Sequence, residues 1–338
     1  MHPMSPTPTR RAFLTGSLAV ATLGATGSLL PGSAAAAGGG FVPYSADSLF
    51  RSRVAGAPVD ATATSSFRAF MKTHPDQRST PYPAINGVDG NQWGTAYATG
   101  LASHPVWKLT GTVPGEVAML KTQGFHAPAW FGDMLTGTSD SPFVVMDRAT
   151  GWSIWAANAR VVGPNTISVG AAGLFEHASN GLDRRNPRSN STLNFRSRGA
   201  IPDAMVIRRT LVNKGIAAGT GLGHVLHMFL CETNSAAGFC HPMIGAESGK
   251  SGWGAEGQRI AIAPSVDLTK RGLSPAGLVV ARTLQQHGTY IGDNSGSSSA
   301  LKAEQSSSTR DPWGGLLRQD ALRGVTWDDF VVLPKGWQ

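Results

Sequence analysis

The chain has 338 residues, of which 15% are charged and 42 are glycine, and its formal net charge is +8. Typical globular domains are about a quarter charged, so this composition favours turns and short strands over long surface helices. A basic surface attracts acidic polymers, but no dense Lys/Arg run with interleaved aromatic residues occurs, so nucleic acid is not an expected partner.

The first 37 residues predict an export signal. Arg10 and Arg11 precede Phe13 and Leu14, and a moderately apolar run then leads to the small-residue stretch GSAAAAGGG. This order is typical of a secretory signal and resembles a twin-arginine signal, which implies the twin-arginine export machinery as a partner. The alternative is an ordinary secretory signal with a chance pair of arginines. We expect cleavage near Ala37 and a secreted, extracellular protein.

The rest of the chain is predicted to form an exposed leading segment, residues 38–58, and one domain, residues 59–338. A helix is predicted directly after Asp60, a good N-cap residue, and is expected to end at Pro75. One face of this helix carries Phe67, Phe70 and Met71. No later segment is long and apolar enough for a membrane helix, so no stable membrane insertion is expected.

Short strands are predicted between residues 106 and 264, because apolar and β-branched runs alternate there with turn residues. Asp147 to Gly151 is expected to be the turn of a hairpin. This spacing indicates a mainly β fold, an antiparallel, jelly-roll-like β-sandwich with two packed helices. The predicted strands are residues 106–113, 143–147, 152–162, 166–176, 204–213, 224–232 and 259–264.

The only two cysteines, Cys231 and Cys240, lie close together in the sequence. Outside the cytoplasm such a pair predicts a disulfide that closes a hairpin, with a stabilisation of about 3 kcal/mol. Their spacing matches neither a redox nor a zinc motif. No metal and no cofactor are therefore predicted.

The second helix is predicted after Ser274, with Pro275 at its first position and Gly288 at its end. A strand, residues 289–293, follows it and leads to a Gly/Ser-rich turn. The strand thus presents Asp293 at its exit.

Residues 219–338 contain a recognisable order of segments: RIAIAPSVDL, the helix, QQHGTYIGDNSG, a tryptophan and WDDFVVLPKG. This order resembles a broad group of twin-arginine-exported, secreted bacterial β-sandwich proteins, some of which are thought to act on polysaccharides. The group's His-Ala-Leu is matched by His227–Phe229, and its Tyr-Gly-x-x-x-x-Asp by His287, Gly288 and Asp293. The resemblance implies a polysaccharide-related function and assigns no catalytic residue.

Asp293 is a candidate general acid or base, or a sugar ligand; alternatively, it caps the turn amides of Asn294 and Ser295. Tyr290 and His287 are a candidate acid–base pair of the kind that lyases use to remove the proton alpha to a uronate carboxyl group. His287 can instead place a favourable charge at the end of its helix.

Three further residues are candidates for catalysis. His227 lies on a strand predicted to be buried, and it becomes a functional candidate only if its ring opens into a cleft. Asp147 and Glu176 are carboxylates near strand ends. Glycosidic bond hydrolysis needs two carboxyl groups about 5 Å or about 6.5–9.5 Å apart, a distance that sequence alone does not provide. Each of the three can also be an ordinary structural residue.

Nine tryptophans occur beside only four tyrosines. Trp93, Trp253 and Trp313 are flanked by Gly, Ser or Asp and are predicted to be exposed, where an indole ring can stack on a sugar. They can equally line loops between sheets.

Several motifs of other enzyme classes are missing: Gly-x-Ser-x-Gly, His-Glu-x-x-His, the P-loop and the dinucleotide fingerprint. These absences argue against a serine hydrolase, a zinc protease and a nucleotide enzyme. From the export signal, the predicted sandwich, the tryptophans and the resemblance, we expect a secreted protein that cleaves a polysaccharide or cell-wall glycan, including acidic ones, by hydrolysis or elimination. A non-catalytic glycan- or wall-binding protein and an extracellular structural or interaction protein are the alternatives. An enzyme is expected to have a cleft with two titratable groups. A binding protein is expected to have a surface with aligned indole rings, and an interaction protein a large apolar patch.

Overall fold

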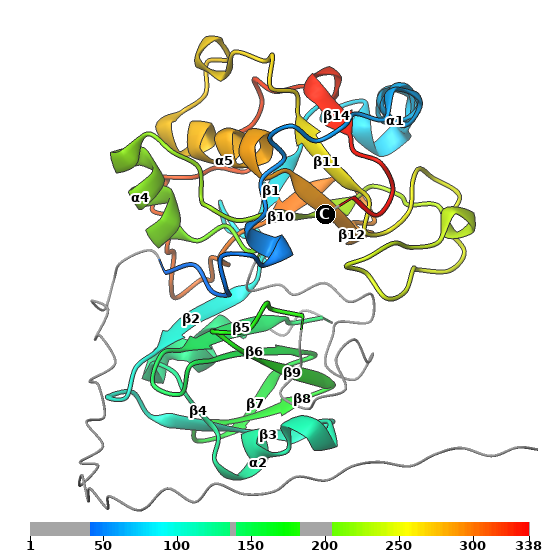
Figure 1. Cartoon of the computed structure of the whole chain (residues 1–338). Helices are drawn as coiled ribbons and strands as arrows, with labels where there is room; N and C mark the ends of the chain where they lie inside the picture. The colour runs from blue at the N-terminus through cyan, green and yellow to red at the C-terminus, as the bar shows by residue number, and fades with distance from the viewer. Residues whose placement is uncertain (1–40, 136–139, 183–204, 338) are drawn as a thin grey trace, which may run out of the picture. The chain divides into compact units, whose positions relative to one another are not determined.

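The computed structural model describes residues 41–135, 140–182 and 205–337. Within the chain, Gly38–Gln338 forms one compact unit. The described residues are mainly β, with three mixed sheets and several helices (Figure 1). The predicted export signal, residues 1–37, lies outside the described residues.

Both predicted helices are confirmed. α1 spans Ala61–Thr73 and α5 spans Pro275–Gln286. The side chains of Asp60 and Ser274 accept hydrogen bonds from amides in the first turns, as N-cap residues do. Gly288, with φ +67°, follows α5 and turns the chain into the next strand.

A further helix, α4, spans Arg209–Ala218, so the strand predicted over residues 204–213 is wrong. The apolar positions continue at helical spacing beyond residue 213, and Gly219 caps the helix in the left-handed conformation. Its buried residues are Leu211, Val212 and Gly215. The short α2 spans Met119–Thr122. The 3-10 turns are Leu49–Arg51, Pro75–Gln77, Gly115–Val117, Ala129–Met134, Ser235–Ala237, Leu268–Lys270 and Trp327–Asp329.

A six-stranded sheet has the order β1-β13-β10-β12-β11-β14. It shares one hydrophobic core with α1, α4 and α5, and Figure 1 shows these helices around it. Its strands are β1 Ala84–Asn86, β10 Leu226–Leu230, β11 Arg259–Ile262, β12 Thr289–Asn294, β13 Ala300–Lys302 and β14 Phe330–Val332.

Two four-stranded sheets, in the orders β2-β5-β6-β9 and β4-β3-β8-β7, share a second core. The predicted hairpin is confirmed: β5 and β6 pair antiparallel, and the amide of Gly151 donates to the carbonyl of Asp147. The strands are β2 Ala96–Gly100, β3 Val106–Gly111, β4 Phe125–His126, β5 Phe143–Asp147, β6 Trp152–Ala157, β7 Arg160–Gly163, β8 Thr166–Val169 and β9 Ala171–Glu176.

The predicted antiparallel, jelly-roll-like sandwich is not confirmed, because all three sheets are mixed. β1 pairs parallel with β13, β10 with β12, β2 with β5, and β3 with β8. Strand-like sequence predicts where strands form, but the direction of pairing depends on partners distant in the chain. The mainly β prediction itself is correct.

Two local predictions need correction. The leading segment is not exposed throughout, because Tyr44 and Phe50 are buried in a small core of their own with Tyr290. Cys231 and Cys240 are free thiols and form no disulfide. Cys231 packs into the core of the six-stranded sheet, and burial raises the pKa of its thiol to about 11. Cys240 instead pairs through its backbone amide with the carbonyl of Glu256.

No helix among the described residues is long and apolar enough to cross a membrane.

Candidate functional site

A cleft of about 740 Å³ opens at the carboxyl ends of β10 and β12. Because these two strands are parallel, they end at the same edge of the sheet, where Phe229 pairs with Asp293. Loops and neighbouring strands complete the walls. The lining includes Asn86, Asn91, Trp93, Asp140, Phe229, Glu247, Lys250, Asp293, Asn294, Lys302 and Gln319.

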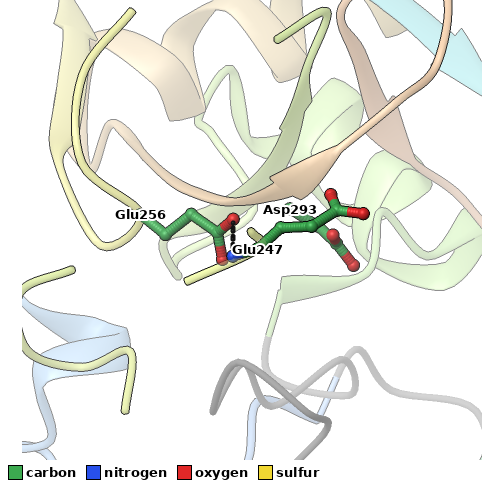
Figure 2. Close-up of side chains that lie close together, drawn as sticks. All are labelled: Glu247, Glu256 and Asp293. Carbon is green, nitrogen blue, oxygen red and sulfur yellow. Dashed lines mark hydrogen bonds between the residues drawn. The ribbon is translucent and has the colours of Figure 1, made fainter. Parts of the chain in front are cut away.

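Three carboxylates gather at this cleft. Glu247, Glu256 and Asp293 each place one oxygen within 4.8 Å of the others, and Figure 2 shows the three side chains side by side. Glu247 and Asp293 are half-buried and line the cleft, whereas Glu256 is fully buried beneath them. Two carboxylates of the three are thus available to a molecule in the cleft.

The buried Glu256 fixes the position of the Glu247 backbone. Oε1 of Glu256 accepts the backbone amide of Glu247 at 3.0 Å, the bond drawn in Figure 2. The hydroxyl of Ser235 donates to the carbonyl of Glu247 at 2.7 Å and accepts the amide of Lys250 at 2.8 Å. Both backbone groups of Glu247 are therefore tied, although it lies in a long loop between β10 and β11.

Asp293 has a mixed environment. Its Oδ1 accepts the amide of Asn294 at 2.9 Å, which matches part of the predicted turn-capping role. The other predicted capping partner, the amide of Ser295, donates instead to the carbonyl of Leu230. Asp293 also lines the cleft, so the turn-capping bond and exposure to a ligand coexist.

Trp93 is the exposed aromatic residue of the cleft, with 51% of its surface accessible. Its amide donates to the side chain of Asn91 at 2.8 Å, and its carbonyl accepts the ammonium group of Lys302. Gly94 follows it, and a Cβ there would lie 2.5 Å from Cα of Gly87. This close backbone approach requires glycine and fixes the loop that presents the indole.

A narrow pocket of about 20 Å³ continues the cleft inward. It shares Trp93, Asp140, Phe229 and Lys302 with the cleft, and it brings in His227. The ring of His227 is 3% exposed and packs on Phe229, with ring centroids 4.6 Å apart. His227 borders this pocket but is not among the described residues that line the cleft, so its catalytic role stays a prediction.

The predicted lyase pair lies elsewhere. Tyr290 is buried, and its hydroxyl accepts a hydrogen bond from Arg259 at 3.4 Å. Burial raises the pKa of Tyr290 and lowers that of His287, whose Nδ1 lies 2.9 Å from the carbonyl oxygen of Ser52. Neither residue is among the described residues that line the cleft, so they do not meet a substrate bound there.

Asp147 and Glu176 are also not among the described residues that line the cleft. Asp147 is fully buried at the hairpin turn, where its carboxylate accepts the amides of His126 and Ala149. Glu176 is exposed at the end of β9. Asp147 therefore has the contacts of a turn cap.

Two of the three predicted sugar-stacking tryptophans are structural in their contacts. Trp313 is 1% exposed, so its predicted exposure is wrong, and its indole donates to the carbonyl of Glu304 at 2.7 Å. Trp253 is half-buried, donates to Ser66 and packs edge-on against Phe67. Trp93 is the one of the three that lines the cleft.

Sequence reasoning missed Glu247, Glu256 and Asn294. The first two occur in HPMIGAESGKSGWGAEG, residues 241–257, a Gly/Ser-rich loop between two apolar strands. Acidic residues in such a loop were a usable signal, since binding residues concentrate in loops held by rigid elements. Their proximity to Asp293 had no signal, because it depends on how the loop between β10 and β11 folds against β12, a strand distant in the sequence.

The three oxygens of the carboxylate cluster have the number and chemistry to contact a divalent cation, which prefers oxygen ligands. The two accessible carboxylates also have the chemistry for acid–base and nucleophilic catalysis. Comparison of the chain with known protein families, with curated proteins and with solved structures found no match. The site is therefore interpreted from its own geometry.

Proposed function

We propose that this protein is a secreted glycoside hydrolase that cleaves a polysaccharide or cell-wall glycan in the cleft at the ends of β10 and β12. The observation that carries the proposal is the pair Glu247 and Asp293, whose carboxylate oxygens lie within 4.8 Å of each other on the cleft wall. The export signal predicted for residues 1–37 supports an extracellular substrate.

The separation of the two carboxylates favours one of the two established geometries. Retaining glycosidases place their carboxyl groups about 5 Å apart, while inverting enzymes leave about 6.5–9.5 Å for a water molecule. Because one oxygen of each carboxylate lies within 4.8 Å of the other, the closer spacing fits better, and we propose a double displacement with retention. One carboxyl group protonates the glycosidic oxygen while the other attacks the anomeric carbon, and water then releases the sugar with the first group acting as base.

The other residues that line the cleft have side chains of the kind that bind sugars. An exposed indole at Trp93 offers an apolar face to a ring, and Asn86, Asn91 and Gln319 offer amide groups to hydroxyls. Lys250 and Lys302 add positive charge that suits acidic sugars. Elimination is disfavoured, because Tyr290 and His287 do not line the described cleft.

The test is cleavage of a polysaccharide panel by the mature protein, with Glu247→Gln and Asp293→Asn as variants. The panel contains cellulose, xylan, chitosan, arabinogalactan, polygalacturonate and alginate. We expect new reducing ends without the ultraviolet absorbance of unsaturated products, and a loss of about 10³-fold in kcat in each variant. Glu176→Gln, outside the described cleft, is the matched control and is expected to keep the wild-type rate.

Azide distinguishes the two roles. In Glu247→Ala and Asp293→Ala, which leave room for the anion where the amide variants do not, it should restore activity, giving a glycosyl azide of inverted configuration from the variant lacking the nucleophile and of retained configuration from the variant lacking the acid. Products of inverted configuration from the wild type would contradict the double displacement. Activity that is lost in EDTA and restored by Ca²⁺ would contradict it too, since the carboxylates would then act as cation ligands. Binding to a panel member without cleavage would instead support the non-catalytic alternative.

A further inference from the structure

We propose that Asn294 is a positioning residue that sets the orientation of the Glu247 carboxylate. This inference rests on the proposed hydrolase function of the same cleft. Asn294 ends β12 next to Asp293, and its Nδ2 donates to Oε2 of Glu247 at 2.6 Å. It thus joins the two carboxylates of the proposed mechanism, one through its side chain and the other through its own backbone amide.

The orientation of the Asn294 amide follows from its partners. The backbone amide of Thr233 lies 2.6 Å from Oδ1 of Asn294. A backbone N–H can only donate, so the atom facing it must be the amide oxygen. The NH₂ group then points at Glu247. A flipped amide would set two donors against each other at Thr233 and an oxygen against a carboxylate at Glu247.

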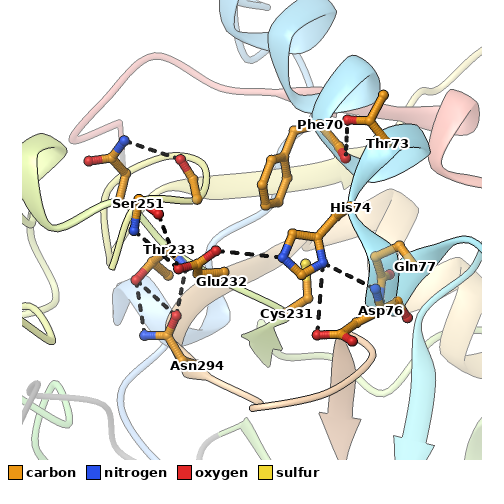
Figure 3. A network of polar contacts seen from close by, with 12 residues as sticks. Phe70, Thr73, His74, Asp76, Gln77, Cys231, Glu232, Thr233, Ser251 and Asn294 are labelled. Atoms are coloured by element: carbon orange, nitrogen blue, oxygen red, sulfur yellow. Dashed lines mark hydrogen bonds and ion pairs between the residues drawn. The ribbon is translucent and has the colours of Figure 1, made fainter. Parts of the chain in front are cut away.

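The position of Thr233 is fixed by burial and by hydrogen bonds. It is 1% exposed, and its hydroxyl lies 3.2 Å from Oδ1 of Asn294 and 3.4 Å from Oε1 of Glu256. The preceding residue, Glu232, accepts the amide of Ser251 at 3.2 Å and lies 3.6 Å from Nε2 of His74 at the end of α1 (Figure 3).

The backbone of Asn294 is therefore fixed by strand pairing while its side chain contacts Glu247. Its backbone belongs to β12, where Asn294 pairs with Leu230 of β10, whereas Glu247 lies on a loop. A carboxylate on a loop needs such a partner, because catalytic groups must be held within about 0.5 Å of the productive position.

The test compares Asn294→Ala and Asn294→Asp with the control Asn213→Ala on the exposed face of α4. On a substrate cleaved by the wild type, we expect kcat to fall about 100-fold in both Asn294 variants, as for a misplacement of about 1 Å. KM should change less than about threefold, because Trp93 and the other polar residues that line the cleft remain. The pH profile of kcat should change in Asn294→Asp, which sets a second carboxylate against Glu247. A residue that only supported the fold would lower the thermal midpoint without changing that profile.

Crystal structures of the wild type and Asn294→Ala give a second readout that needs no substrate. We expect the Glu247 side chain to leave its wild-type rotamer while β12 stays in place. An unmoved Glu247, or wild-type kcat in Asn294→Ala beside an inactive Glu247→Gln, would overturn the inference. An active Glu247→Gln would overturn the proposed function instead, and the crystal structures would still decide the positioning.

Discussion

At the scale of single residues, Trp93 shows how a sequence prediction can be right for one member of a set and wrong for another. All three candidate tryptophans lie among small and polar residues, yet Trp93 alone of them lines the described cleft. The difference comes from their indole partners, because Trp313 and Trp253 have hydrogen-bond acceptors on the protein itself. A tryptophan whose indole N–H donates to another group of the protein is held against the protein by that bond and does not present its ring to a ligand.

Replacement of Trp93 by alanine is therefore expected to weaken substrate binding rather than chemistry. We expect KM for a cleaved polysaccharide to rise about tenfold, which corresponds to the loss of about 1.4 kcal/mol, with kcat within about threefold of the wild type. Steady-state kinetics measure both constants. Trp253→Phe, which keeps the packing on Phe67, is the matched control and should leave KM unchanged. A fall in kcat without a rise in KM would contradict a stacking role.

At the scale of elements, β12 combines two roles in six residues. Tyr290 and Ile291 are buried in two different cores, while Asp293 and Asn294 reach the cleft. Between them lies Gly292, where a Cβ would lie 2.0 Å from Nε2 of His227 on the neighbouring strand. Glycine at this position is therefore required for the ring of His227 to lie across β12.

Gly292→Ala is expected to push the His227 ring out of place and to lower the free energy of unfolding by about 1–3 kcal/mol, the usual cost of overpacking. Urea unfolding followed by tryptophan fluorescence measures the change. In a His227→Ala background the same substitution should cost markedly less, because the atom it would meet is gone. Equal costs in the two backgrounds would show that the clash lies elsewhere.

Elements whose limits depend on neighbouring residues were predictable. α1, α5 and the β5–β6 hairpin begin and end at caps and turn residues adjacent in the sequence. α4 was missed because its first residues also suit a strand, and only the full run up to Gly219 distinguishes the two. Strand pairing was not predictable, since a parallel pair such as β10 and β12 joins segments about sixty residues apart.

At the scale of the whole molecule, buried titratable groups make stability depend on pH. Burial lowers the pKa of His224 to about 3 and that of His177 to about 4, from the ordinary 6.5. The unfolded chain therefore binds protons at these residues before the folded chain does, and stability is lost as the pH falls from 6.5 towards 3. Burial raises the pKa of Glu304 to about 7. Protonation of this carboxylate in the folded chain therefore adds stability as the pH falls from about 7 to about 4.5, which opposes the effect of the two histidines.

His224→Asn should reduce this acid sensitivity. His224 is fully buried, with Nδ1 2.8 Å from the carbonyl oxygen of Val225, a bond that an asparagine amide can replace. Between pH 6 and 4, we expect the free energy of unfolding to fall about 1 kcal/mol per pH unit less steeply in the variant than in the wild type. Urea unfolding at pH 7, 6, 5 and 4 gives the two slopes, and equal slopes would contradict a buried neutral histidine as the cause.

The amino-acid sequence by itself determined the mainly β character of this protein, its helix limits and its main hairpin, because caps, turns and alternating apolar residues act over a few neighbours. It also placed Asp293, His227 and Trp93 among the candidates. Only the tertiary structure brought Glu247 and Glu256 to Asp293 and its neighbour Asn294. These residues meet because the loop between β10 and β11 contacts the end of β12, an arrangement set by long-range packing that leaves no local pattern.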